Sequence, residues 1–134
     1  MLFRSVEGPV LSDGVATAAQ LTLDDDTVYF TSGRYTGLIQ SVPLKGGTTT
    51  TLVSGQLDPQ GIAVDDRYVY WVTVGQLPAE GTVMRADKRV AGPPQFLAFA
   101  QRKPIALAVD DAFVYWVSQG DAGKANGGIY RVPK

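Results

Sequence analysis

Three pairs of adjacent aspartates are the residues of this chain with the clearest potential for chemistry. They are Asp24-Asp25, Asp65-Asp66 and Asp110-Asp111, and each is followed after two further residues by Val-Tyr. Paired carboxylates can hold a divalent cation or work as a general acid and base. The alternative is turn chemistry, because Asp accepts backbone N–H bonds in tight hairpins. The sequence favours the turn, since a pair recurs at a predicted hairpin position in every repeat.

The sequence lacks the commonest catalytic side chains. The 134 residues include no His and no Cys, so the usual general base, the commonest transition-metal ligand and thiolate chemistry are all missing. We therefore assign no catalytic residue and no metal ligand. A net charge of -1, from 12 basic and 13 acidic residues, gives no electrostatic footprint for nucleic acid or an anionic membrane. The first residues lack an apolar run long enough for a signal segment or a membrane span.

The aspartate pairs belong to a repeat that must position them. The first Asp of each pair falls at 24, 65 and 110, so the spacings are 41 and 45 residues, which match the length of one β-propeller blade. Within each repeat, apolar and polar residues alternate in short runs that Gly, Pro and Asp residues separate. This pattern predicts four short strands, a to d. Strand a is predicted at 20–23, 61–64 and 105–109, strand b at 28–31, 68–73 and 113–118, strand c at 37–42, 81–86 and 128–132, and strand d around Leu52 and Leu97.

The aromatic residues of strand b invite a second reading as a stacking platform for a sugar or a base. They are Tyr70, Trp71, Tyr115 and Trp116. We expect them instead in the core between adjacent blades, because aromatic side chains of this size dominate the area buried when sheets pack face to face.

The whole chain, 1–134, reads as one all-β segment of a propeller. Its blade repeats cover approximately 15–54, 55–99 and 100–134, and residues 1–14 are predicted as a c-d hairpin. The last repeat has no strand d of its own, and residues 9–12 supply a strand of that type. Such an offset between sequence repeat and blade predicts a latch that closes a ring.

The segment Asp58-Pro59-Gln60-Gly61-Ile62-Ala63-Val64-Asp65-Asp66, followed by Tyr68-Val69-Tyr70-Trp71, resembles the YWTD-type blade of six-bladed β-propellers. The pattern is also similar to NHL repeats and to gluconolactonase-like propellers. This resemblance implies the architecture and slightly favours a secreted or periplasmic location. It implies no one activity, because such relatives include receptor ectodomains, scaffolds and a minority of hydrolases or lyases. The chain also departs from the YWTD pattern, with Val-Thr and Val-Ser after the two tryptophans.

Three blades are fewer than the four to eight that close a ring. We therefore expect half of a six-bladed propeller, completed by a second copy about a two-fold axis. An open arc would expose the apolar faces of its terminal blades and a bare strand edge. The residues of the expected oligomer latch are Pro9, Val10, Leu11, Ile129, Tyr130 and Val132. A segment of a longer propeller is the second interpretation, and a complete small monomer is the third.

The variable b-c and d-a connections should share one face, where propellers usually bind ligands. The candidate ligand-contacting residues there are Arg34, Tyr35, Gln60, Gln76, Arg102, Lys103, Asp121 and Asn126. We predict a non-catalytic module that binds an unidentified small molecule or protein and needs no cofactor. The alternative is a metal-assisted, lactonase-like hydrolase with Ca²⁺. Against it, the residues just before strand a, at 19–20, 60 and 103–104, include no carboxylate to hold such an ion.

Overall fold

The computed structural model describes residues 10–134, and every regular element within them is a β-strand. The strands form three antiparallel sheets of four, four and three strands, which confirms the predicted all-β class and the repeat. The first sheet contains β1 (Leu21–Leu23), β2 (Thr27–Ser32), β3 (Gly37–Pro43) and β4 (Thr50–Gln56). The second contains β5 (Pro59–Val64), β6 (Tyr68–Thr73), β7 (Gly81–Asp87) and β8 (Gln95–Gln101). The third contains β9 (Pro104–Val109), β10 (Phe113–Ser118) and β11 (Gly128–Pro133).

Each sheet is a meander in which neighbouring strands are consecutive in sequence. The predicted strands a, b, c and d correspond to these strands in order, with small shifts at their ends. Leu52 and Leu97 lie within β4 and β8 as expected. The third sheet has the order β11-β10-β9, so the outer edge of β11 pairs with no strand among the described residues.

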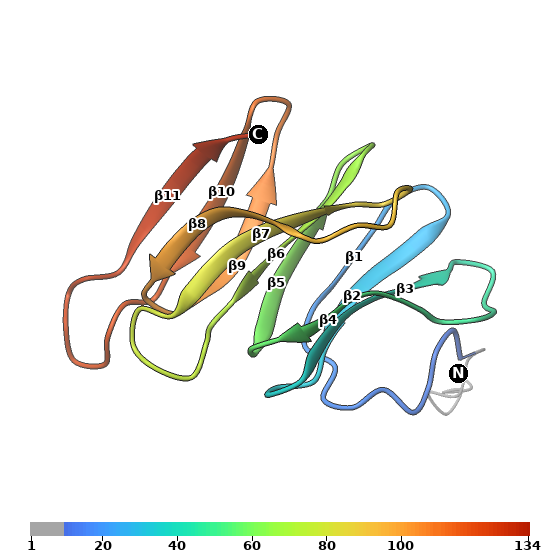
Figure 1. The fold of residues 1–134 in the computed structure, drawn as a ribbon, viewed down its shortest axis with the longest axis horizontal. Helices are drawn as coiled ribbons and strands as arrows, with labels where there is room; N and C mark the ends of the chain where they lie inside the picture. The colour runs from blue at the N-terminus through green and yellow to red at the C-terminus, as the bar shows by residue number, and fades with distance from the viewer. Residues whose placement is uncertain (1–9) are drawn as a thin grey trace, which may run out of the picture.

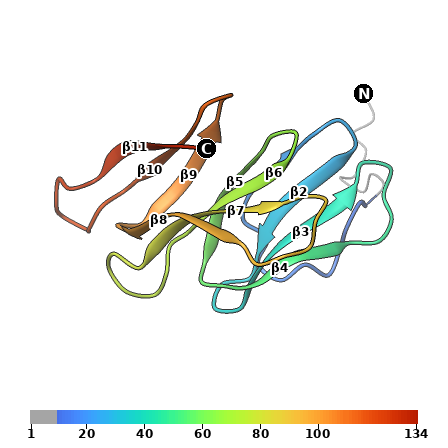
Figure 2. The same cartoon turned by 45° about the horizontal axis from the view of Figure 1, so that its top comes forward.

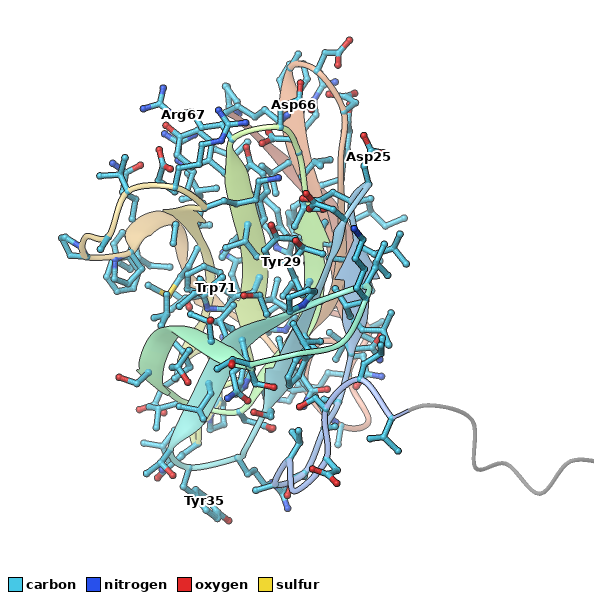
Figure 3. The ribbon with its side chains drawn as sticks, turned by 90° about the vertical axis from the view of Figure 1, so that its right-hand side faces the viewer. Asp25, Tyr29, Tyr35, Asp66, Arg67 and Trp71 are labelled. Carbon is cyan, nitrogen blue, oxygen red and sulfur yellow. The ribbon has the colours of Figure 1, made fainter. Side chains whose placement is uncertain are left out.

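The three sheets are stacked face to face, as Figure 1 shows, and Figure 2 shows the same succession from a second angle. The first strands of the three sheets, called the innermost strands below, lie next to one another, because β5 contacts both β1 and β9. The a-b turns and the b-c loops lie at opposite ends of the stack. Figure 3 places Asp25 and Asp66 of the turns at one end and Tyr35 of a b-c loop at the other.

Two apolar clusters hold the sheets together, one at each junction. The first joins Tyr29 and Ile39 of the first sheet to Trp71 and Met84 of the second. The second cluster joins the opposite face of the second sheet to the third. Its buried residues are Tyr70, Val72, Val83, Val114 and Trp116. Period-2 alternation thus sends the adjacent Tyr70 and Trp71 into different cores.

The prediction that the strand b aromatics are core holds for three of the four. Tyr70, Trp71 and Trp116 are buried, whereas Tyr115 is half-buried. Tyr115 lies in the same register as Tyr70, on the face of the third sheet that no other sheet of residues 10–134 covers.

Proline and glycine meet where one sheet begins beside the next. A Cβ built on Gly37 would collide with the ring of Pro59, and one built on Gly81 would collide with the ring of Pro104. Both prolines open the innermost strand of the following sheet and are fully buried. Glycine is needed at these two positions because a side chain there has no space.

The segment from Val10 to Ala19 precedes the first sheet and forms no strand. It lies against that sheet, since the Gly33 amide donates to the Ala16 carbonyl and the Ser12 and Thr49 hydroxyls are 2.7 Å apart. The larger part of the predicted N-terminal hairpin, residues 1–9, lies outside the described residues. Within 10–134, no helix has the length and apolar character to cross a bilayer.

Candidate functional site

The first aspartate of each pair forms a turn, as the sequence predicts. One carboxylate oxygen of Asp65 accepts the amide N–H groups of Arg67 at 2.9 Å and Tyr68 at 2.7 Å. Asp24 and Asp110 make the same two bonds, to the amides two and three residues on. A carboxylate in this arrangement replaces a backbone turn and fixes the hairpin. The first carboxylates therefore have a structural task.

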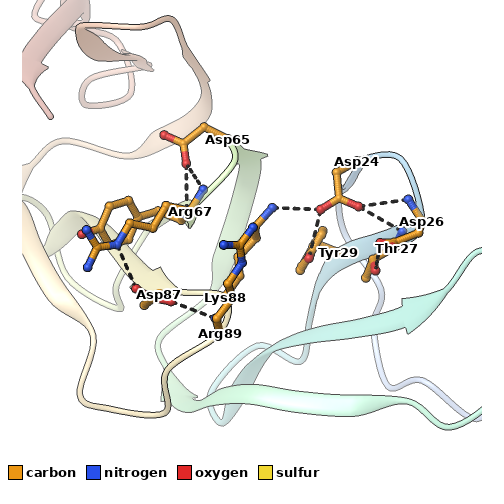
Figure 4. Close-up of polar contacts among 10 residues, drawn as sticks. Asp24, Asp26, Thr27, Tyr29, Asp65, Arg67, Asp87, Lys88 and Arg89 are labelled. Carbon is orange, nitrogen blue, oxygen red and sulfur yellow. Dashed lines mark hydrogen bonds and ion pairs between the residues drawn. The ribbon is translucent and has the colours of Figure 1, made fainter.

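The second oxygen of each of these carboxylates joins a tyrosine and, at both sheet junctions, a lysine. Asp24 Oδ2 accepts the Tyr29 hydroxyl at 3.1 Å and Lys88 Nζ at 2.9 Å, and Lys88 comes from the second sheet (Figure 4). Asp65 Oδ2 accepts the Tyr70 hydroxyl at 2.7 Å and Lys134 Nζ at 2.7 Å. Each lysine thus binds the turn of the preceding sheet.

These bridges perturb the ionisation of both partners in each Asp-Tyr pair. Burial alone raises the pKa of Asp24, but hydrogen bonds from Lys88 and the Asp26 amide outweigh it and lower that pKa to about 2. Burial likewise opposes ionisation of Asp65, yet Lys134 and the Tyr68 amide hold its pKa well below the ordinary range. Burial, and then the charge of Asp24, raise the pKa of Tyr29 to about 12. None of these groups is suited to proton transfer near neutral pH.

Acid should weaken the first junction through Asp24. Because its folded pKa lies below the ordinary 3.8, the stabilisation is complete above about pH 4 and is lost as pH falls through about 2. The shift corresponds to about 2 kcal/mol. We expect Asp24→Asn to lower the free energy of unfolding by about that amount at pH 6 and by much less at pH 2. Urea unfolding followed by tryptophan fluorescence at several pH values measures both.

Asp25→Asn is the matched control for that experiment, because Asp25 is exposed in the same turn and its carboxylate makes no hydrogen bond among the described residues. Its stability should follow the wild type at every pH. Equal losses at pH 6 and pH 2 in Asp24→Asn would contradict a role for the ionised carboxylate.

A second contact, which was not predicted from the sequence, recurs at both junctions. Trp71 Nε1 donates to Gln56 Oε1 at 2.9 Å, and Trp116 Nε1 donates to Gln101 Oε1 at 2.8 Å. Each glutamine ends the outer strand of one sheet, and each tryptophan lies in the next sheet. The spacing of 15 residues is the same in both pairs, and that repeat is the signal that would have revealed them.

The loop end carries the best candidate binding site. A cavity of about 540 Å³ opens between the b-c loop of the second sheet, the b-c loop of the third and the d-a turn that joins these sheets. Four of the predicted ligand-contacting residues line it: Gln76, Arg102, Lys103 and Asp121. Lys124 lines it as well, so its charged side chains are three cations and one carboxylate.

Asp121 organises the polar side of this cavity. Its Oδ2 atom lies 2.6 Å from Arg102 Nη1 and 3.8 Å from Lys124 Nζ, and it accepts Asn126 Nδ2 at 2.8 Å. Asn126 Oδ1 in turn accepts the Asp121 amide at 2.8 Å. Lys103 takes part in no ion pair within residues 10–134. The cavity therefore keeps positive charge that the carboxylate does not balance.

The other predicted ligand-face residues do not line this cavity. Arg34 and Tyr35 are exposed in the loop between β2 and β3 at the same end of the stack, and the Arg34 guanidinium lies 5.9 Å from the Tyr35 ring. Gln60 is part of β5, where Nε2 donates to Asp58 Oδ1 at 2.9 Å and the carbonyl accepts Thr31 Oγ1 at 2.9 Å. Gln60 thus joins two sheets.

The described residues of the predicted latch belong to β11 of the third sheet and to the segment before the first sheet. Ile129 and Tyr130 are exposed on β11, and Tyr130 stacks on Trp116 with ring centroids 5.7 Å apart. Val132 packs against the second cluster. Val10 is exposed, Leu11 lines a cavity against the first sheet, and Pro9 lies outside the described residues.

Metal ligands do not gather in the described part of the chain: residues 10–134 contain no group of three or more His, Cys, Asp or Glu side chains that could hold an ion. The chain matches no protein-family model, and a search of curated proteins finds no match for it.

Proposed function

We propose that this chain is a non-catalytic ligand-binding module built from three β-propeller blades. Two copies complete a six-bladed ring, and the loop end of the ring binds the ligand. The repeated chemistry of the junctions supports the blade assignment, because both junctions use the same Asp-Tyr-Lys, Trp-Gln and Gly-Pro contacts. A likeness to YWTD, NHL and gluconolactonase-like propellers agrees with it but defines no ligand.

The observation that carries the binding role is the cavity at the loop end. Its walls come from connections of two different sheets and from the turn between them. Loops that a rigid scaffold positions are where binding residues concentrate. The aspartates that first suggested chemistry hold turns at the opposite end of the stack, so they do not supply this cavity with acid or base groups.

The charge of the cavity indicates the kind of ligand. Arg102, Lys103 and Lys124 outnumber Asp121, and Asp121 already holds Arg102 and Asn126. Lys103, which makes no ion pair within residues 10–134, is available to bind a ligand. A small molecule bearing carboxylate or phosphate groups would therefore find complementary charge there.

Citrate, as a trivalent carboxylate probe, tests this function by isothermal titration. We expect binding in the millimolar range or tighter, and about a tenfold loss of affinity in Lys103→Gln, because one charge-assisted contact is removed. Lys45→Gln is the matched control: it changes the net charge equally but lies after β3 at the turn end. Equal losses in both variants would contradict a site at the loop end.

A titration with Ca²⁺ distinguishes the metal-assisted hydrolase from the non-catalytic binding module. A ligand that binds only the folded form raises the melting temperature by mass action. We expect millimolar Ca²⁺ to leave that temperature unchanged, and a rise of several degrees would favour the metal-assisted class.

A further inference from the structure

The two outer faces of the stack repeat the faces that meet inside it. On the face of β3, β7 and β11 that points toward a following sheet, the same register holds Ile39, Val83 and Ile129. The first two are 0% exposed, whereas Ile129 is 78% exposed. Ile129 therefore occupies a position that is buried at both internal junctions, but no sheet of residues 10–134 covers it.

The outer face of the first sheet is the complementary face. Leu21 of the first sheet has the register of Ile62 in the second, since they pair with Phe30 and Trp71. Ile62 is 7% exposed and Leu21 is 64% exposed. An apolar cavity of about 450 Å³ lies on this face, between the sheet and residues 11–19.

Internal repetition indicates which kind of surface fits each outer face. Toward the following sheet, the third sheet presents Tyr115 and Asp110 as the second presents Tyr70 and Asp65, and the hydroxyl-carboxylate distance is 2.7 Å in both. The face that covers the second sheet belongs to another sheet of this chain. A second copy offers such a face at its own first sheet.

The lysine of the repeat has no counterpart at that first sheet. Lys88 and Lys134 each follow strand c, where their amides donate to the Arg67 and Ala112 carbonyls. The residue with the same amide bond in the first sheet is Leu44, whose amide donates to the Asp26 carbonyl at 2.8 Å. Within residues 10–134, no cation lies within ion-pair distance of Asp110.

We infer that Asp110 of one copy faces Leu44 of the other in the two-copy ring, so each closing junction lacks the Lys-Asp bridge of the internal junctions. This inference rests on the proposed ring and deepens it, because it names the surfaces that meet. It also makes the closing junctions the weakest ones, where the ring separates first. The Trp-Gln contact is missing there as well, since Phe30 has the register of Trp71 and its side chain carries no N–H group.

Leu44→Lys tests the inference by restoring the missing donor. Leu44 is exposed in the single chain, so the change should leave the fold intact, and circular dichroism verifies this. One charge-assisted hydrogen bond gives about tenfold in affinity. The ring has two closing junctions, so the dimer dissociation constant from sedimentation equilibrium should fall about a hundredfold. Leu44→Met, which lengthens the side chain without charge, should leave that constant within about threefold of wild type.

Combining Leu44→Lys with Asp110→Asn shows whether the new lysine meets Asp110. We expect the gain to disappear in the double variant. A gain that persists there, or a dimer that Leu44→Lys does not tighten, overturns the inference while the ring stands. A mass equal to one chain for both wild type and Leu44→Lys, measured at about 0.2 mM, overturns the ring itself.

Discussion

Replacing Trp71 by alanine is expected to cost about 3–5 kcal/mol of stability, because it empties the largest buried site of the first junction. The change also leaves Gln56 Oε1 without its 2.9 Å donor in a buried place. Small domains are stable by only about 5–15 kcal/mol. The variant should therefore unfold at a much lower urea concentration, which circular dichroism measures.

Trp71→Phe separates the two contributions to that loss. It keeps an aromatic ring, as Phe30 does at the same register of the first sheet, and removes only the N–H donor and part of the volume. We expect it to cost about 1–3 kcal/mol. A loss below about 1 kcal/mol for Trp71→Ala would contradict a core at this junction.

A single methyl group at Gly81 is expected to destabilise the second junction by about 3 kcal/mol. The new Cβ would lie 2.7 Å from the Gln101 carbonyl oxygen and would collide with the ring of Pro104. Neither neighbour can move easily, because Gln101 closes β8 and buried Pro104 opens β9. The second and third sheets would have to separate locally.

Gly92→Ala provides the comparison for Gly81→Ala. Nothing lies within 4 Å of a Cβ built on Gly92, which is in the connection between β7 and β8. Its free energy of unfolding in urea should stay within about 0.5 kcal/mol of wild type. If both alanine variants were equally stable, the close approach at Gly81 would be refuted.

The strands could be predicted from the sequence because two independent signals agree. Alternation gives each strand its faces, and an aspartate that caps a turn marks the place where strand a ends. The Asp65 turn and the burial of Trp71 follow from these signals alone. The alternation of apolar and polar residues does not predict which residue of a neighbouring sheet a side chain contacts.

The contacts between sheets were missed for this reason. Lys88 lies 64 residues from Asp24, and Gln60 reaches a threonine 29 residues away. The predicted boundaries put Gln60 just before strand a and hence on the ligand face, whereas β5 already begins at Pro59. The location of Gln76 and Asp121 at the loop end could be predicted, since the variable loops of such a stack lie at one end whatever their detailed contacts.

The molar mass of the unmodified chain in solution tests the central claim most directly. Light scattering after size-exclusion chromatography should give twice the chain mass of 14.3 kDa, because we propose that a second copy covers the exposed side chains of Ile129 and Leu21. A mass equal to one chain, unchanged on raising the concentration to about 0.2 mM, would contradict the paired ring.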